Sequence, residues 1–237
     1  MSRDKVERPL PKRFYKAVSV GEGGAILLDG RPVKTPMKQN LCLPTPALAQ
    51  AVAAEWQAQD KLIDPAKMPL TKLANTAIDR VGAERAHVAG EVVAFAGNDL
   101  VCYRADEPEE LVALQRQQWD PVLAWALAAL DAGFTFTHGI IHVAQDVHAL
   151  KAVERHVATL DDFALTGLHN VMTLTGSALI AIMLQARALA PQAAWTAAHV
   201  DEDFQISQWG EDFEAADRRA ARKAEFEATA QFLALLA

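Results

Sequence analysis

The sequence contains little cysteine: Cys42 and Cys102 are the only two in 237 residues, and they stand far apart. Neither belongs to a C-x-x-C pair. Half of the residues (51%) are hydrophobic, so the chain can bury a sizeable core and does not need a disulfide scaffold. This cysteine usage is typical of a protein from a reducing compartment.

Long apolar runs are also lacking. The most apolar segment, 171–184 (VMTLTGSALIAIML), is too short to span a bilayer, which needs about 20 apolar residues. We expect it to be a buried core helix. The first residues, MSRDKVERPLPKRF, contain no apolar stretch of the kind found in a secretory signal, and Asp4 and Glu7 are atypical of a transit peptide.

Basic residues are not in excess. The net charge is −7 and the sequence pI is about 5.5, so the chain lacks the general basic character that nucleic-acid binding requires. The charge is uneven, with bases prevailing near the start and acids near the end. This asymmetry indicates either solvated faces with a mild dipole or a bipolar surface that steers a protein partner.

Signatures of nucleotide and metal chemistry are missing. The glycines within 21–24 follow a predicted strand, but Ile26 stands where a dinucleotide fingerprint needs glycine, and a second strand follows instead of a helix. No G-x-x-x-x-G-K-[ST] loop and no H-E-x-x-H motif occur. His138 and His142 have i, i+4 spacing, but the segment between them disfavours a helix. We therefore predict no cofactor and no metal site.

Nucleophilic catalysis has no clear signature either. The chain contains no G-x-S-x-G motif, and Ser177 is expected in the middle of a helix, bonded back to a helix carbonyl. Cys102 is interpreted as a small buried apolar residue rather than as a reactive thiol. A pair of acidic residues acting as acid and base cannot be identified or dismissed from one sequence.

Strand patterns dominate the start of the chain. We expect strands over 14–20, 25–28 and 31–35, with 40–43 as a candidate for a further strand. Asp29-Gly30 between two apolar runs predicts a tight hairpin, and Pro32 suits an edge strand. Thr45 is a candidate N-cap with Pro46 as the first helical residue.

Beyond Gly82 the apolar spacing is mainly helical. We expect helices near 83–97, 108–131, 146–158, 161–188, 191–206 and 210–235, with a strand or extended loop at 133–143. The sequence therefore predicts an α+β fold. A small N-terminal domain containing antiparallel strands (1–81) precedes a larger, mostly α-helical domain (82–237).

The chain has five tryptophans and only two tyrosines, and most of these tryptophans are expected in the core. Trp209-Gly210 joins two helical patterns, so Trp209 is expected to lock the last helix onto the body. That last helix alternates acids and bases. The alternation indicates an exposed, ion-paired helix face or, alternatively, a docking surface.

Several stretches, in order, carry a resemblance to a known family. They are RFYK (13–16), LDGRPVKTP (28–36), LA-x-AVAAEW (48–56), MPLTKLANTAID (68–79), NDLVCYRADEPEELVALQRQQWDPVLAW (98–125), LDDFALTGLHNVMTLTGSALIA (160–181) and QWG (208–210). Together they are similar to the F-type ATPase assembly chaperones that bind the alpha subunit, a family of mitochondria and alphaproteobacteria.

The resemblance implies a two-part fold, no enzymatic activity and no cofactor. It implies transient binding to the unassembled alpha subunit until the beta subunit replaces the chaperone, with no nucleic acid and no membrane insertion. It also implies a chain that is monomeric when free and cytoplasmic in a bacterium, since the mitochondrial members are in the matrix.

The candidate partner-binding residues are taken from the matching motifs, and Trp56 is expected to be a packing anchor at the domain junction more than a direct contact. They are Glu55, Trp56, Asp79, Asp99, Tyr103, Arg104, Gln115, Asp120, Trp209, Glu214 and Asp217.

Two alternatives remain from other classes. One is a small-molecule enzyme with an acid/base carboxylate pair in a cleft between the two parts, which should show perturbed pKa values. The other is a permanent structural subunit, which should expose a large and dominantly apolar face.

Overall fold

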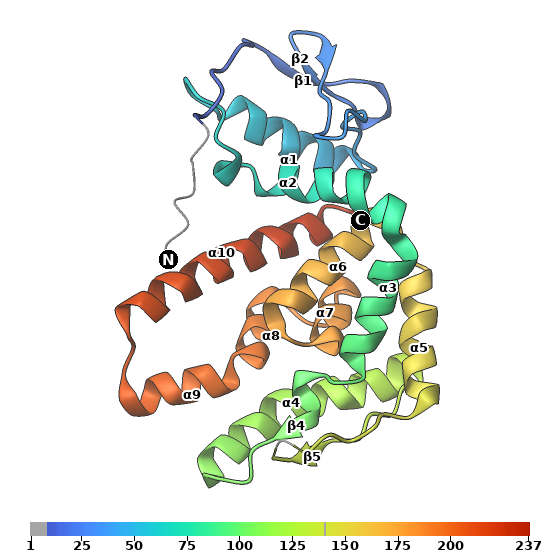
Figure 1. Ribbon diagram of the computed structural model, residues 1–237, viewed down its shortest axis with the longest axis vertical. Helices are drawn as coiled ribbons and strands as arrows, with labels where there is room; N and C mark the ends of the chain where they lie inside the picture. Colours follow the sequence, from blue (N-terminus) through green and yellow to red (C-terminus); the bar gives the residue numbers. More distant parts are fainter. Residues whose placement is uncertain (1–8, 140) are drawn as a thin grey trace, which may run out of the picture.

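The computed structural model describes residues 9–139 and 141–237. The expectation drawn from Asp4 and Glu7 therefore lies outside the described residues. Within them the predicted α+β class is confirmed: a small antiparallel sheet near the N-terminus is followed by a larger set of helices (Figure 1).

The sheet consists of β1 (Val18–Val20), β2 (Ile26–Leu28) and β3 (Arg31–Pro32), paired antiparallel in that order. The hairpin predicted at Asp29-Gly30 is confirmed, since both residues have positive φ (47° and 78°). Pro32 lies in an edge strand, where its missing N–H is tolerated. Segment 40–43 forms only isolated bridges, such as Cys42 to Ala25, and not a strand of its own.

Helix α1 (Pro46–Gln57) packs against this sheet, and α2 (Pro69–Thr76) packs against α1. The predicted cap of α1 is confirmed, because the Thr45 hydroxyl accepts a hydrogen bond from the Leu48 N–H at 3.2 Å. After α2 the chain continues through one π-helical segment, η3 (Ala77–Val81), into α3 (Gly82–Ala96). A short 3-10 turn, η2 (Pro65–Lys67), precedes α2, and another, η1 (Glu22–Gly24), lies between β1 and β2.

Among the described residues after α3, helices predominate, and β4 (Tyr103–Arg104) pairs with β5 (Thr137–His138) in a two-stranded parallel sheet. The remaining elements are η4 (Leu100–Cys102), α4 (Glu109–Leu130), α5 (Val147–Ala158), α6 (Asp162–Thr175), α7 (Ala178–Gln185), α8 (Pro191–Ala198), α9 (Val200–Trp209) and α10 (Phe213–Ala234).

Two predicted helices are each broken in two, so those predictions were wrong. The helix expected at 161–188 ends at Gly176, which has φ 70°, and α7 begins after Ser177. Ser177 is therefore not in the middle of a helix: its hydroxyl caps α7 by accepting the Ile180 N–H at 3.0 Å. The helix expected at 191–206 is interrupted at His199 and extends to Trp209.

Two large clusters of buried apolar side chains form most of the core, and a small third one consists of Ala132, Ala149 and Ala152. The larger one lies in the helical part and includes all of α7 from Ala178 to Leu184, as expected for that apolar run. The other large cluster lies between the sheet, α1 and α2, and it also takes in Phe232 from the end of α10. The last helix therefore packs into both cores, and the boundary proposed at 81/82 stays a prediction.

Both cysteines are free thiols. Cys102 is completely buried, and this burial raises its pKa to about 12, which agrees with the interpretation of Cys102 as a core residue. Among the described residues, no helix is long and apolar enough to cross a membrane.

Candidate functional site

The eleven candidate residues fall in three places. Three lie where the sheet, α1 and η3 meet, five (Arg104 and four others) lie at, in or between η4 and α4, and three lie at or just after the junction of α9 and α10. The structure therefore does not bring all of them to one surface. Their contacts separate those that build the fold from those that face outward.

Glu55 of α1 serves as the cap of α2. Its carboxylate accepts hydrogen bonds from the Leu70 N–H (2.7 Å), the Thr71 N–H (2.8 Å) and the Thr71 hydroxyl (2.7 Å). These bonds satisfy N–H groups that the first turn of a helix leaves free. Burial raises the pKa of Glu55, and the three hydrogen bonds oppose that shift. The residue is engaged on both oxygens and holds α1 to α2.

Asp79 and Trp56 also make framework contacts. Asp79 in η3 accepts from the Thr35 hydroxyl (2.6 Å) and the Met37 N–H (3.0 Å), which ties the loop after β3 to the helices. The Trp56 carbonyl accepts from the Tyr15 hydroxyl at 2.7 Å, and the two rings lie 5.9 Å apart. The expectation that Trp56 packs as an anchor agrees with these contacts.

Asp99 is fully buried and caps two elements at once. It accepts from the Val101 N–H in η4 (3.2 Å) and from the Leu179 N–H at the start of α7 (2.9 Å). Burial raises the pKa of this carboxyl to about 6, although the hydrogen bonds with Ser177 and the backbone act in the opposite direction.

Arg104 is a buried cation whose side chain is only 3% exposed. Its guanidinium donates to the Val101 carbonyl (2.9 Å) and to the Asp120 carboxylate (2.8 Å), while Asp120 itself is 57% exposed. The same group lies over the rings of Trp119 (5.4 Å) and Phe136 (4.7 Å). Asp120 thus joins a buried charge to the surface.

Tyr103 lies next to Arg104 and faces the segment after β5. Its hydroxyl is 3.1 Å from the His142 Nδ1 and 3.4 Å from the Asn98 side-chain oxygen. The ring is only half-buried, so Tyr103 is partly accessible. His142 and Phe136 were not among the predicted site residues, because the sequence pattern of 133–143 indicated only an extended segment.

Gln115 connects the start of α4 to α9. It is 2% exposed, its amide oxygen accepts the Ala105 N–H at 2.8 Å, and its amide nitrogen donates to Asp201 at 2.7 Å. Asp201 was missed by the sequence reasoning. It stands in an acidic run with Glu202 and Asp203, and nothing in that run distinguishes the one carboxylate that pairs with a buried amide.

The third group lies around the connection between α9 and α10. Trp209 is 78% exposed, so the prediction that it locks the last helix onto the body was wrong. Gly210, with φ 82°, ends α9, and Asp212 caps α10 by accepting the Ala215 N–H at 3.1 Å. The turn points both Trp209 and Phe213 (89% exposed) outward, and Phe213 was not predicted.

Glu214 and Asp217, the other candidates of this third group, are also at the surface. The Glu214 side chain is 87% exposed and lies 3.7 Å from Arg218, one turn along α10. Asp217 is exposed and follows Phe213 by four residues, so both project from the same face of the helix. These two acids and Trp209 are the most accessible members of the predicted set.

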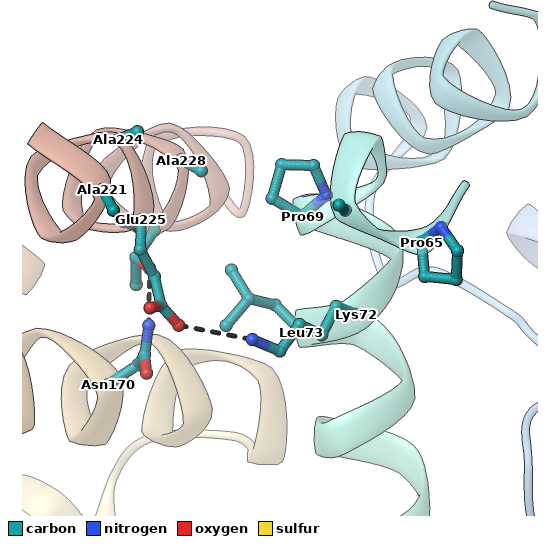
Figure 2. A pocket seen from close by; sticks show the side chains of 11 residues that line it. Pro65, Pro69, Lys72, Leu73, Asn170, Ala221, Ala224, Glu225 and Ala228 are labelled. Atoms are coloured by element: carbon teal, nitrogen blue, oxygen red, sulfur yellow. Dashed lines mark hydrogen bonds and ion pairs between the residues drawn. The ribbon is translucent and has the colours of Figure 1, made fainter. Parts of the chain in front are cut away.

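A cleft of about 270 Å³ separates α2 from α10 (Figure 2). Pro65, Pro69 and Leu73 lie on one side of it, and alanines of α10 lie on the other. Lys72 and Glu225 face each other across it at 3.5 Å. The enzyme alternative predicts an acid/base carboxylate pair in a cleft of this kind, between the two parts of the chain.

The acid/base pair of that alternative is not found in this cleft, since Glu225 is the single carboxylate among the residues that line it. An adjoining cavity of about 260 Å³ is lined by the carboxylates of Glu84, Glu91 and Glu225, and that of Glu91 lies 3.1 Å from the His169 Nε2. The two carboxyls whose pKa is raised by burial, Glu55 and Asp99, line neither cavity and are used as helix caps.

Comparison with known proteins gives a consistent result. A family model described as ATP12 chaperone protein matches residues 12–127. The chain is similar to the crystal structure of Atp12 from Paracoccus denitrificans, with 42% identity and a TM-score of 0.90, covering 96% of this chain and 99% of that one. A mutant of the same P. denitrificans protein matches with 42% identity, a TM-score of 0.90 and coverage of 96% and 98%.

A third solved structure is similar to the same extent. The Atu1473 protein from Agrobacterium tumefaciens has 42% identity and a TM-score of 0.91, with coverage of 98% of this chain and 88% of that one.

Proposed function

The chain belongs to the ATP12 chaperone family and is an assembly chaperone of the ATP synthase, and we propose that its client is the unassembled alpha subunit of the catalytic sector. In this proposal the chain shields the alpha subunit until the beta subunit takes its place. Binding is transient and non-enzymatic, and the free chaperone is a monomer. It acts where the catalytic sector is assembled, which is the cytoplasm in a bacterium.

The observation that carries the proposal is the correspondence over nearly the whole chain. The likeness to Atp12 extends over 96% of the chain at 42% identity, so it includes both the sheet-containing part and the helical part. The function of a family can change when only one domain is shared. Here both parts correspond, so the proposal does not depend on a single shared domain.

The exposed side chains agree with the kind of interface that a transient chaperone needs. A subunit made for a ring exposes apolar interfaces before assembly, and such surfaces promote aggregation. A chaperone that must later leave needs a moderate interface with polar and charged contacts, not a permanent apolar seal. Here the most exposed aromatic side chains, Trp209 and Phe213, stand among acids, which differs from the broad apolar face expected of a permanent subunit.

The contacts of the candidate residues indicate which of them are free to contact a partner and which support the fold. We assign partner contact to the accessible members: Tyr103, Asp120, Trp209, Glu214 and Asp217. We assign a framework role to the residues whose polar groups are already engaged inside the fold: Glu55, Trp56, Asp79, Asp99, Arg104 and Gln115.

The test is co-purification of the tagged chain with the alpha subunit of the same organism, co-expressed without the beta subunit. We expect soluble alpha subunit to be recovered with the tag and to be released when the beta subunit is added. A parallel culture that expresses the alpha subunit alone measures how much stays soluble unaided. If the alpha subunit aggregates equally with and without this chain, the client assignment is wrong.

A further inference from the structure

The connection between α9 and α10, residues 209–213, combines exposure with a defined shape; we call it the α9–α10 turn. Phe213 (89% exposed) and Trp209 (78% exposed) are the two most exposed large hydrophobic side chains in the described part of the chain. The turn lies at the left edge of the molecule in Figure 1, on the side away from α5.

The local backbone holds these two aromatic residues in place. The Gly210 N–H donates to the Ile206 carbonyl at 2.8 Å and closes α9, after which the positive φ of glycine reverses the chain. Asp212 then caps α10, so Phe213 is its first residue. Two side chains that would normally be buried are thus presented by a short turn with a helix fixed at each end.

The surroundings of the turn are acidic. A hollow of about 250 Å³ between the two helices is lined by Glu202, Glu211 and Asp212 together with Trp209. Arg219 also lines it, but its guanidinium is paired with Asp203 and lies 3.8 Å from Glu202.

Further acids continue along α10. Asp217 projects from the same face as Phe213, and Glu214 stands beside it. Arg218 is near Glu214 at 3.7 Å, which leaves the acids of this surface in excess over the bases.

We propose that the α9–α10 turn is the docking surface for a basic, apolar segment of the client, a refinement that rests on the proposed function. Apolar side chains of that segment cover Phe213 and fill the hollow beside Trp209. Its lysines or arginines lie over the indole face and against the acids. The charge complementarity selects a basic segment and repels an acidic one, and it allows release, because such contacts are weaker than an apolar seal.

The first experiment titrates a fluorescent amphipathic peptide of Leu and Lys into the full chain, with a Leu/Glu peptide of the same pattern for comparison. The aromatic variant is Trp209→Ser with Phe213→Ser, and the charge variant is Glu211→Lys with Asp217→Lys. We expect each pair to weaken Leu/Lys binding by about tenfold or more.

Matched controls come from α5 on the opposite side of the molecule. Val147 is 64% exposed, and Glu154 is an exposed acid seven residues later on the same helix face. Val147→Ser and Glu154→Lys should leave the affinity unchanged. Equal binding by the wild type and both turn variants, or equal affinity for the Leu/Glu peptide, overturns the proposal.

The second experiment repeats the co-purification of the alpha subunit with the same variants. Loss of the alpha subunit from the turn variants, but not from the α5 controls, supports docking at this turn. Recovery by the turn variants at the wild-type level overturns the docking site and leaves the proposed function intact. If even the wild type recovers none, the proposed function fails, and the peptide titration alone decides whether the turn binds a basic segment.

Discussion

Gly167 of α6 lies where the last helix of the chain passes closest. A Cβ added at this position would be 2.5 Å from the Leu233 Cδ2 and 2.7 Å from its Cγ, well inside van der Waals contact. Leu233 of α10 belongs to the main core, and its neighbour Phe232 belongs to the core beneath the sheet. The end of α10 is therefore anchored in both cores, and we expect Gly167→Ala to be destabilising.

The magnitude follows from two opposing effects. Alanine inside a helix is favoured over glycine by about 1 kcal/mol. Overpacking a dense core costs about 1 to 3 kcal/mol, and Leu233 lies in such a core, where it is only 8% exposed. The net expectation is a loss of up to about 2 kcal/mol in the free energy of unfolding, which is the overpacking cost less the helix-propensity gain.

Gly90 of α3 provides the matched control, because nothing lies within 4 Å of a Cβ built there. Gly90→Ala should raise the free energy of unfolding by about 0.5 to 1 kcal/mol. Urea denaturation followed by circular dichroism measures both variants on the same scale. If Gly167→Ala is as stabilising as Gly90→Ala, the close packing of α6 on α10 is refuted.

The double variant Gly167→Ala/Leu233→Ala separates a steric clash from other causes. Truncation of Leu233 alone should cost about 2 to 5 kcal/mol, because it leaves a cavity. In the double variant the new methyl group enters that cavity, so the combined loss should be smaller than the sum of the two single losses by about 1 to 3 kcal/mol. Simple additivity would contradict the clash.

Three further variants test the buried polar contacts. Burial raises the pKa of Asp99 to about 6 in the folded protein, so its carboxyl binds a proton more tightly when folded. Its contribution to stability is therefore fully present below the unfolded pKa of about 4 and is lost as the pH rises through about 6, by up to about 3 kcal/mol relative to Asp99→Asn. Gln115→Leu leaves the Ala105 N–H without its acceptor and should cost about 1 to 3 kcal/mol in urea denaturation. Ser177→Ala removes the cap of α7 and should cost about 1 kcal/mol.

These three variants have distinct contrary outcomes. Parallel pH profiles for Asp99→Asn and the wild type between pH 4 and about 6 would show that the Asp99 carboxyl does not hold its proton more tightly in the folded state. A Gln115→Leu variant of wild-type stability would remove the argument for a bond between α4 and the Ala105 N–H. An unchanged urea-denaturation midpoint for Ser177→Ala would mean that the Ser177 cap does not stabilise α7.

The sequence predicted best where the deciding residues are neighbours in the chain. The Thr45 cap and the Asp29-Gly30 hairpin both depend on contacts within a few residues, and both are confirmed. The same kind of signal was present at Gly176-Ser177 but was outweighed by the apolar run around it. A left-handed glycine followed by a capping serine was sufficient to end one helix and begin another.

The candidate site was harder to predict because its members are brought together only by folding. Gln115 and Asp201 are 86 positions apart, and Asp99 and Leu179 are 80 apart. A motif shows that a carboxylate is present, but not whether its oxygens are taken up by distant N–H groups. Several of the predicted contact residues therefore lie in the framework, and Asp201 and Phe213 were missed.

The sequence by itself determined the α+β class, most helix ends and the family, because periodicity, caps and ordered motifs are properties of the chain. Tertiary structure alone decided which polar and aromatic residues are exposed to solvent. Whether a side chain is buried depends on which distant segments pack against it. Glu55 hydrogen-bonds to the start of α2, whereas Trp209 and Phe213 are covered by no other segment of the described chain and stay exposed.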